Sequence, residues 1–483
     1  MKNLTLLALA LLAACGDNLT GATPAPDAGP TADAAPDAMQ PFVPPEFTPL
    51  ALSTGGTDQL LGATPGPNGS FYAVGFRAAS FEATSDRELV LVKLTTQGAL
   101  DTTFGGGDGI ASLNVQTGGS GELWRGIVTQ SDGKIVVLGT VEDEVNAVDR
   151  DAAVVRFNAD GTLDTTFGVT GVDNGIVRLD LEQANINGAT VKGVDTPWGL
   201  AVDASNRLYI HAAQRNAGVG RLDTDFAVVR LTAGGLVDVT FAATGGTPGK
   251  FTLDIQNTDA AGSCQDCVRG IYVLADGTIL AAGYANSTGV GSVQPVLYKL
   301  TSAGALDTTF GTGGVFHEVL MQGFTEVYGV AIVAGKLVTA GYGRNAATGN
   351  NDWVSARFNA NGTLDTTWGT AGKVVFDGSM GDNPDNNRNN VALPGGRVAL
   401  LGSTGSPATS SDAMFAIVSG NGAFDTAFGT GVVKYDLGGA EQLWGGAVAS
   451  TGNAALFVGF KGAGATPSAT SNDDAYIVVL PLP

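Results

Sequence analysis

One phrase of the form LDTTFG recurs along the chain and constrains its fold more than any other feature. Its six copies carry the aspartates Asp101, Asp164, Asp238, Asp307, Asp365 and Asp425. The copies lie about 65 residues apart, and each aspartate follows a glycine by three residues. In five copies a Lys or Arg precedes the aspartate by eight residues, and Ile417 is the exception. A regular period of this length indicates a repeat protein whose units pack against their neighbours.

Each unit is predicted to contain four short strands. In the second unit the apolar runs and turn residues predict strands over 126–130, 134–140, 152–158 and 175–181. The dipeptide Asp132-Gly133 predicts a two-residue hairpin between the first two of them. Gly accounts for 71 of the 483 residues, while charged residues make up only 15%. Many turns between short strands explain this composition better than long amphipathic helices do.

The two ends of the repeat region predict a closed ring. The last unit ends after its third strand, and it has no LDTTFG phrase. Residues 50–57 resemble residues 113–120, a fourth strand with its exit, so we expect residues 47–54 to complete the seventh unit and to protect the edges of the sheet. We therefore expect an all-β fold over residues 46–483. This fold is a seven-bladed β-propeller of four-stranded blades, closed by an N-terminal strand.

The repeated phrase has a structural interpretation. Its Asp carboxylate is expected to accept hydrogen bonds from the backbone of the two residues that follow, as an Asx-type cap. Its Phe or Trp is expected to pack between neighbouring sheets. Because the phrase occurs in nearly every unit, it does not predict a unique active site. The third copy (VDVTFA) and the sixth (FDTAFG) depart mildly from the pattern, which leaves their turn geometry open.

Residues 50–480 resemble the delta-60 repeat family of bacterial exported proteins. The resemblance rests on a hairpin of the DGK type followed by the pattern R-x-N-x-D-G-x-L-D-x-x-F-G, as in residues 156–168. It implies a repetitive β architecture. It implies no particular activity, because the family is defined by its repeat.

The first 45 residues are predicted to address and tether the protein. Residues 1–15 combine Lys2 with a short apolar run and end in Leu-Ala-Ala-Cys. This segment resembles the lipobox of bacterial lipoproteins, which implies that Cys15 is acylated and that the protein belongs to the cell envelope. Gly16 follows the cysteine, which by the same resemblance favours an outer-membrane lipoprotein, facing the periplasm or the outside. Residues 16–45 are rich in Ala, Pro and Asp and predict a disordered tether.

The formal net charge of −21 disfavours nucleic acid as a partner, because such a surface repels phosphate backbones. It is compatible with divalent cations, although a solvated acidic surface explains it equally. The sequence contains no G-x-S-x-G, H-E-x-x-H or P-loop motif, and the chain contains only two histidines. We therefore assign no catalytic residues and expect no cofactor other than Ca²⁺.

The candidate ligand site lies on the face that carries the long connections between second and third strands. There the start of each first strand brings acids and aromatic residues toward the axis of the ring. The candidates are Glu122, Trp124, Asp195, Trp198, Asp266, Glu326, Tyr328, Glu441 and Trp444. An acidic funnel with aromatic rings suits a sugar, a cation or a basic protein segment. The alternative is that each Trp packs between blades and each acid is solvated.

Two local features complete the prediction. The loop 142–151 contains Glu142, Asp143, Glu144, Asp149 and Asp151, a density of carboxylates that suits Ca²⁺. It has no EF-hand spacing, so a solvated loop is the alternative. If Cys15 is lipidated, Cys264 and Cys267 remain as one pair in an oxidising compartment, and we predict a disulfide between them.

These observations favour a binding or interaction protein that is anchored to the membrane and recognises a glycan or a protein. The alternative is a hydrolase or lyase that acts on an extracellular polysaccharide with funnel carboxylates as acid and base. A purely structural surface protein is the third possibility, favoured if side chains of the protein itself fill the funnel.

Overall fold

The computed structural model describes residues 41–483 apart from short stretches. These stretches are residues 54, 81–84, 120, 143–149, 182, 187–188, 193–194, 216–223, 256–265, 287–292, 346–348, 380–384, 406–410 and 463–473. Phe42–Pro483 forms one compact unit.

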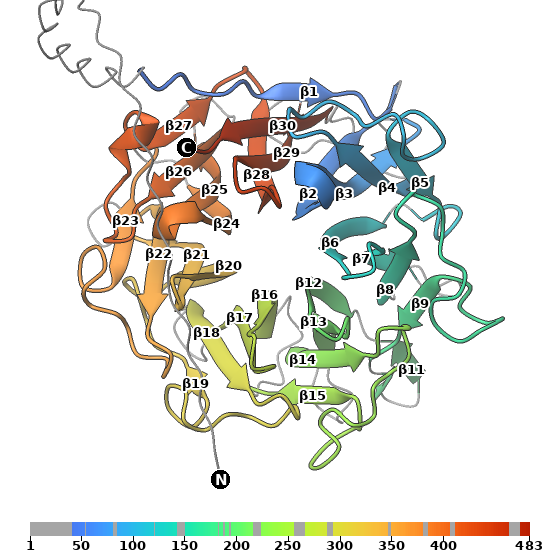
Figure 1. Cartoon of the computed structure of the whole chain (residues 1–483). Helices are drawn as coiled ribbons and strands as arrows, with labels where there is room; N and C mark the ends of the chain where they lie inside the picture. The colour runs from blue at the N-terminus through green and yellow to red at the C-terminus, as the bar shows by residue number, and fades with distance from the viewer. Residues whose placement is uncertain are drawn as a thin grey trace, which may run out of the picture. The chain divides into compact units, whose positions relative to one another are not determined.

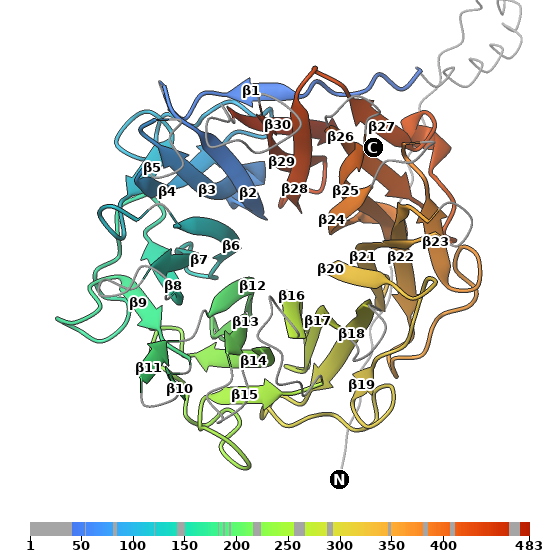
Figure 2. The ribbon, with the colours of Figure 1, turned by 180° about the vertical axis from the view of Figure 1, so that it is seen from behind.

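Seven four-stranded antiparallel sheets surround a central axis, as the sequence predicts (Figures 1 and 2). Blade 1 comprises β2 (Asp58–Pro65), β3 (Phe71–Ala78), β4 (Arg87–Leu94) and β5 (Ile110–Leu113). Blade 2 comprises β6 (Leu123–Thr129), β7 (Ile135–Glu142), β8 (Arg150–Phe157) and β9 (Ile176–Leu179). Blade 3 comprises β12 (Thr196–Val202), β13 (Leu208–Arg215), β14 (Thr224–Leu231) and β15 (Lys250–Leu253). Blade 4 comprises β16 (Asp266–Val273), β17 (Ile279–Asn286), β18 (Val293–Leu300) and β19 (Val315–Phe316).

The last three blades repeat this order. Blade 5 comprises β20 (Thr325–Val333), β21 (Lys336–Arg344), β22 (Asn351–Phe358) and β23 (Lys373–Phe376). Blade 6 comprises β24 (Asn386–Leu393), β25 (Arg397–Gly405), β26 (Ser411–Val418) and β27 (Val432–Tyr435). Blade 7 comprises β28 (Ala440–Val448), β29 (Ala454–Gly462), β30 (Asp474–Pro481) and, from the other end of the chain, β1 (Thr48–Leu50).

The predicted ring closure is confirmed by the pairing of β1 with β30. Thr48 lies opposite Ile477, and Leu50 lies opposite Ala475 (Figure 1). Phe47, just before β1, is buried and stacks on Tyr476 of β30 and on Tyr435 of β27. The closing segment therefore joins blade 7 to blade 6 as well as completing its own sheet.

The repeated phrase fastens each blade to the next. In all six copies one carboxylate oxygen of the Asp accepts a hydrogen bond from the backbone N–H two residues later, at 3.0–3.3 Å. The Phe or Trp of the phrase is buried, and in the first five copies it lies against the phrase's glycine in the next blade, as Phe104 does against Gly161. A backbone hydrogen bond from Gly105 to Asp160 of the next blade crosses the same junction. Both structural expectations for the phrase are thus confirmed.

The basic residue eight positions before the Asp forms an ion pair with it. These pairs are Lys93–Asp101, Arg156–Asp164, Arg230–Asp238, Lys299–Asp307 and Arg357–Asp365, at 2.8–3.2 Å. In the sixth copy, where Ile417 stands at that position, Arg397 of β25 reaches Asp425 at 2.6 Å instead. The second strand thus supplies the charge that the third strand lacks.

The first strand of every blade contains a β-bulge, at which it has one residue more than the second strand that pairs with it. In six blades the second strand has a glycine opposite the bulge: Gly75, Gly139, Gly283, Gly341, Gly402 and Gly459. A Cβ at Gly341 would overlap the carbonyl oxygen of Glu326. Because the bulge changes the side to which side chains point, it decides which residues face the axis.

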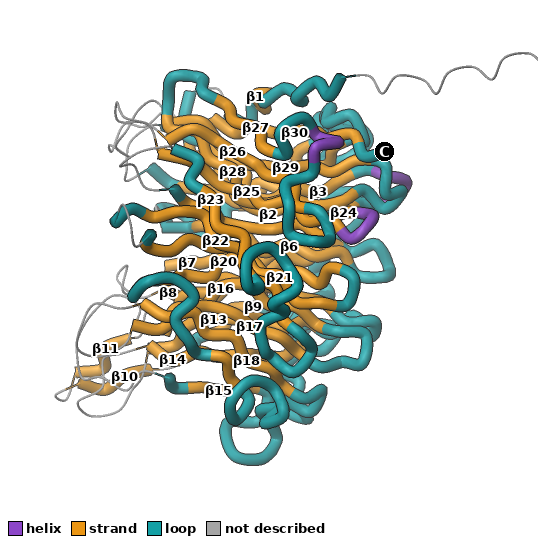
Figure 3. Tube along the Cα trace, turned by 90° about the vertical axis from the view of Figure 1, so that its left-hand side faces the viewer, coloured by secondary structure: helices purple, strands orange, loops and turns teal. Residues whose placement is uncertain are grey.

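The remaining elements are small. The hairpin of β10 (Gln183–Ile186) and β11 (Ala189–Lys192) extends from one face of the disc between blades 2 and 3 (Figure 3). The described helices are the 3-10 turns η1 (Pro67–Gly69), η2 (Pro394–Gly396) and η3 (Thr426–Phe428). Among the described residues, no helix has the length and apolar character that a membrane span requires.

Candidate functional site

The bulged residues of the first strands surround a cavity on the axis of the ring. Each of the seven blades has one large residue in its bulge. These residues are Leu61, Arg125, Trp198, Arg269, Tyr328, Arg388 and Trp444. All of them except Arg269 line a cavity of about 180 Å³, together with small and aliphatic residues such as Ala63 and Leu200.

Three arginines and three aromatic rings form one connected cluster, which we call the channel cluster: Arg125, Arg269, Arg388, Trp198, Tyr328 and Trp444. The guanidinium groups of Arg125 and Arg269 lie 3.9 and 4.1 Å from the ring centre of Trp198. Arg388 lies 4.9 Å from the ring centres of both Tyr328 and Trp444. Cation–π contacts of this kind hold guanidinium groups in fixed positions.

The arginines of the channel cluster are short of counter-charges. Among the described residues, none of the three forms an ion pair, and the Nε atoms of Arg269 and Arg388 lack a hydrogen-bond partner. Arg269 donates to the hydroxyl of Tyr284 at 2.8 Å and to the carbonyl oxygen of Val268 at 2.7 Å. Burial, followed by the charge of Arg269, lowers the pKa of Arg125 to about 9. The cavity wall is therefore cationic in a protein of net charge −21.

Four of the predicted acids lie elsewhere: Glu122, Asp195, Asp266 and Glu441 are fully buried at the junctions between blades. Each accepts a hydrogen bond from a backbone N–H that follows the last strand of the preceding blade. The donors are Gln116, Leu181, Ile255 and Gly439, at 2.6–2.8 Å. Asp58 and Asp385 make the same kind of bond to Ser53 and Gly378. The expectation of an acidic funnel lined by these four residues is corrected, because they brace the blades instead of facing the cavity.

Burial changes the ionisation of two of these acids. It raises the pKa of Glu122 to about 8, and it raises the pKa of Asp195 to the same value. Trp124 is also fully buried, and its Nε1 donates to Glu122 at 3.1 Å. Trp124 thus packs between blades, as the alternative interpretation of the aromatic residues proposed.

The remaining candidates lie at or beside the cavity. Trp198, Tyr328 and Trp444 line it directly. Glu326 is buried and accepts a hydrogen bond from the hydroxyl of Tyr342 at 2.8 Å. The structure therefore brings the three aromatic candidates together and separates them from most of the acids.

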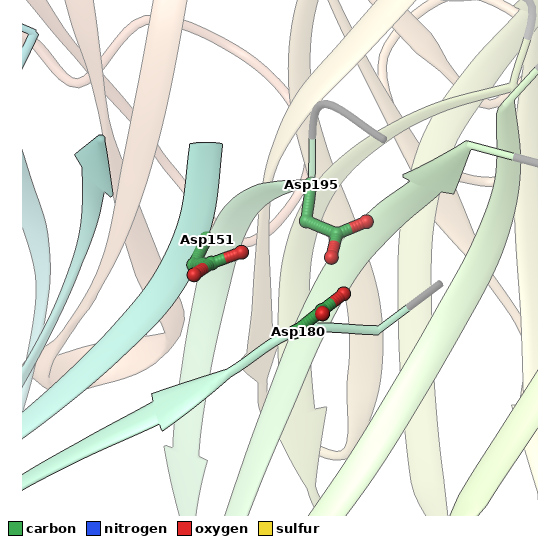
Figure 4. Close-up of side chains that lie close together, drawn as sticks. All are labelled: Asp151, Asp180 and Asp195. Atoms are coloured by element: carbon green, nitrogen blue, oxygen red, sulfur yellow. The ribbon is translucent and has the colours of Figure 1, made fainter. Parts of the chain in front are cut away.

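The carboxylate loop is described only at its ends. Asp143, Glu144 and Asp149 lie outside the described residues, while Glu142 ends β7 and Asp151 lies in β8. Asp151 lies beside Asp180 and Asp195 (Figure 4). The acidic neighbours of Asp151 thus come partly from outside the predicted loop.

The predicted modifications are not tested by the described residues. Cys15 precedes them, and Cys264 lies outside them, while Cys267 is buried in β16. The disulfide between Cys264 and Cys267 and the lipid on Cys15 stay predictions. The last residues of the predicted tether, from Phe42 onward, contact blade 6: the Phe42 ring meets Phe428, and Pro45 accepts a hydrogen bond from Tyr435.

Sequence reasoning missed the three arginines of the channel cluster. A signal for two of them was present, because each precedes a glycine, Gly126 or Gly270, in the first strand of its blade. The residue immediately before each of these glycines is the bulged one: Arg125 before Gly126, and Arg269 before Gly270. Arg388 precedes Asn389, so the same signal was weaker there.

Comparison with solved structures finds other proteins of low sequence identity. A protein of unknown function from Dyadobacter fermentans DSM 18053 is 11% identical, with a TM-score of 0.43, over 91% of this chain and 99% of that chain. The polysaccharide lyase Uly1 is 10% identical, with a TM-score of 0.46, over 94% of each chain. An alpha-L-arabinofuranosidase from Lactobacillus brevis is 13% identical, with a TM-score of 0.32, over 59% of this chain and 89% of that chain.

Comparison of sequences finds a family that matches parts of the chain. No curated protein matches the chain. Residues 130–167, 274–310 and 335–367 match the family described as "Domain of unknown function (DUF5122) beta-propeller". Each matched segment runs through the second and third strands of a blade to the aromatic residue or Thr of its LDTTFG phrase. Three segments of the chain thus match a family whose description names a β-propeller, and the blades in which they lie agree with that description.

Proposed function

We propose that this protein is a binding propeller of the bacterial cell envelope whose axial cavity takes an acidic sugar residue of a glycan. The observation that carries the proposal is the channel cluster, in which Arg125 and Arg388 line one cavity and Arg269 lies beside them, none with an ion pair among the described residues. Arginine forks bind carboxylate and sulfate groups through paired hydrogen bonds. A cavity of about 180 Å³ is smaller than a drug-sized pocket, so it suits a single ring or chain end.

The energetics of the cluster support an anionic ligand. Three like charges around one cavity repel one another, and burial removes water that would screen them. The lowered pKa of Arg125 reflects both effects. An anion that enters the cavity would relieve this repulsion and would satisfy the Nε atom of Arg388, which lines the cavity. The aromatic rings keep the guanidinium groups in place before the ligand arrives, which lowers the entropic cost of binding.

The hydrolase or lyase alternative has less support. It requires a pair of carboxylates that flank one bond of the substrate. None of the residues that line the axial cavity carries a carboxylate. The carboxylates with raised pKa, Glu122 and Asp195, lie at blade junctions and bond to backbone N–H groups. Binding without chemistry is therefore the function that the described residues favour.

Anchoring to the outer membrane through Cys15 is the second part of the proposal. The support for it is the lipobox in the sequence, whose h-region, small residues and cysteine occur in the order that the resemblance requires. Expression of the full chain in a Gram-negative host with labelled palmitate tests it. We expect label in the wild type and none in Cys15→Ser. Equal labelling of both would overturn the anchor.

Calorimetric titration of the full chain with oligogalacturonate tests the binding proposal. A charged hydrogen bond contributes about 1.5–3 kcal/mol, so Arg388→Gln should weaken binding by about 10- to 100-fold. The matched control is Arg87→Gln, because Arg87 also lies over a ring, 4.4 Å from the centre of Phe76, but does not line the cavity. The methyl ester of the same oligosaccharide should bind weakly, since it lacks the charge. Equal affinity for both oligosaccharides, or binding of an acidic peptide alone, would contradict the proposal.

A further inference from the structure

Three acidic residues meet at each of four blade junctions. One comes from the start of a third strand, one directly follows the fourth strand, and one lies at the start of the next blade. The groups are Asp151–Asp180–Asp195, Asp225–Asp254–Asp266, Asp352–Asp377–Asp385 and Asp412–Asp436–Glu441. Within each group, one carboxylate oxygen from every residue lies within 4.8 Å of the others. The same arrangement in four places shows that the fold, and not chance, brings these acids together.

The junction of blades 2 and 3 shows the arrangement most clearly (Figure 4). Asp151 is the second residue of β8, Asp180 follows β9, and Asp195 precedes β12. The backbone N–H of Asp195 donates to the carbonyl oxygen of Arg150 at 2.8 Å, which places Asp195 beside the start of β8. Figure 4 shows the three carboxylates pointing toward one another from these three elements. Asp180 and Asp195 also flank the hairpin of β10 and β11.

Asp195 has one oxygen for which the described residues provide no partner. The side chain is fully buried, and its Oδ2 accepts a hydrogen bond from the N–H of Leu181 at 2.6 Å. Its Oδ1 is buried and has no hydrogen-bond partner. An unsatisfied buried oxygen is rare in native proteins and is unfavourable for stability. The neighbouring carboxylates of Asp180 and Asp151 add repulsion to this cost.

We propose that Asp151, Asp180 and Asp195 bind one Ca²⁺ ion between blades 2 and 3. Ca²⁺ takes six to eight oxygen ligands at about 2.3–2.6 Å, so oxygens on opposite sides of the ion lie about 5 Å apart. The spacing within 4.8 Å in this group matches that requirement. The ion would satisfy Oδ1 of Asp195 and neutralise the repulsion, while water would complete the coordination.

A related junction supports the need for positive charge. Between blades 6 and 7, Nζ of Lys434 lies 2.6 Å from Asp412, so the chain itself supplies a cation to that group.

The junction of blades 7 and 1 offers the opposite comparison. There Asp58 accepts a hydrogen bond from the N–H of Ser53, just as Asp195 does from Leu181. The positions that correspond to Asp151 and Asp180 hold Ala475 and Ala51. That junction has a buried acid without the other two carboxylates.

The test is calorimetric titration of CaCl₂ into the full chain after removal of metal by a chelator. Asp180→Asn and Asp195→Asn each remove one charge from the group and keep the shape of the side chain. Asp58→Asn is the matched control, because it changes the same kind of cap at the junction without the group. Asp180 is exposed, so Asp180→Asn remains informative if Asp195→Asn fails to fold.

We expect the wild type and Asp58→Asn to bind the same number of Ca²⁺ ions. Asp180→Asn and Asp195→Asn should each lose one ion per chain, or bind it at least tenfold more weakly. Three results would overturn the proposal. They are the absence of Ca²⁺ binding by the wild type at millimolar concentration, unchanged binding in Asp180→Asn, and equal loss of binding in Asp58→Asn.

Discussion

Replacement of Phe47 by alanine tests whether the N-terminal segment holds the ring closed. Phe47 is buried, and its ring centre lies 4.7 Å from that of Tyr476 and 5.2 Å from that of Tyr435. The two tyrosines belong to blades 7 and 6, so the substitution removes contacts on both sides of the closing junction.

The expected cost follows from this burial. Replacement of a buried Phe by Ala typically costs about 3–5 kcal/mol, which includes the lost ring contacts and the cavity that remains. We expect about 4 kcal/mol, since both partners are held in β-strands and cannot easily fill the space. At about 2.1 cal/mol/K of unfolding entropy per residue, a unit of this size should lose about 4 °C in Tm.

Urea denaturation followed by tryptophan fluorescence measures the free energy of unfolding. Phe42→Ala is the matched control, because Phe42 is only partly buried and makes one edge contact, with Phe428 at 5.7 Å. It should cost about 1 kcal/mol or less. A loss below about 1 kcal/mol in Phe47→Ala, or equal losses in the two variants, would refute the account of ring closure.

Three further predictions concern the interior of the blades. His211 is fully buried, with Nδ1 at 3.0 Å from the carbonyl oxygen of Arg269, and burial lowers its pKa from 6.5 to about 4. As the pH falls, the unfolded chain therefore takes up this proton before the folded chain does. The free energy of unfolding is unaffected by His211 above about pH 6.5, and it falls by about 3 kcal/mol between about pH 6.5 and pH 4. Urea titrations should show the wild type losing stability faster than His211→Gln over this range, and parallel losses would contradict the assignment. Gly341→Ala should destabilise by about 2–3 kcal/mol because its Cβ would overlap Glu326, whereas Gly55→Ala, with open space around it, should be neutral in the same assay. Arg397→Met should lower the free energy of unfolding by about 1.5–3 kcal/mol, because it leaves Asp425 without its ion pair. Arg77→Met, which removes a more exposed ion pair, should lower it by less than about 1 kcal/mol. Equal losses in the two variants would argue against the compensating role of Arg397.

Much of the fold could be predicted because its signals are local and repeated. The hairpin turns, the Asp caps and the aromatic wedge recur in unit after unit, so each copy reinforces the prediction from the others. The position of β1 followed from counting strands, since the last unit lacked one. The ion pair of Arg397 was not predictable from the period alone, because the charge moved from the third strand to the second.

The site was harder to predict for a physical reason. In a regular strand, side chains alternate between the two faces, and sequence pattern reveals this alternation. A bulge adds one residue and shifts the alternation, and no residue type marks it reliably. The residues that face the axis, such as Arg125 and Arg388, were therefore overlooked, while Glu122 and Asp195 were expected there. The group of Asp151, Asp180 and Asp195 arises only when two blades meet, and sequence analysis had placed two of its members in separate sites.

A crystal structure of the full chain with oligogalacturonate would test the central claim most directly. We predict a sugar carboxylate within about 3 Å of the guanidinium groups of at least two of Arg125, Arg269 and Arg388, with the sugar ring in the axial cavity. An empty cavity at saturating oligosaccharide, or a sugar bound only at the outer loops, would contradict the proposed function.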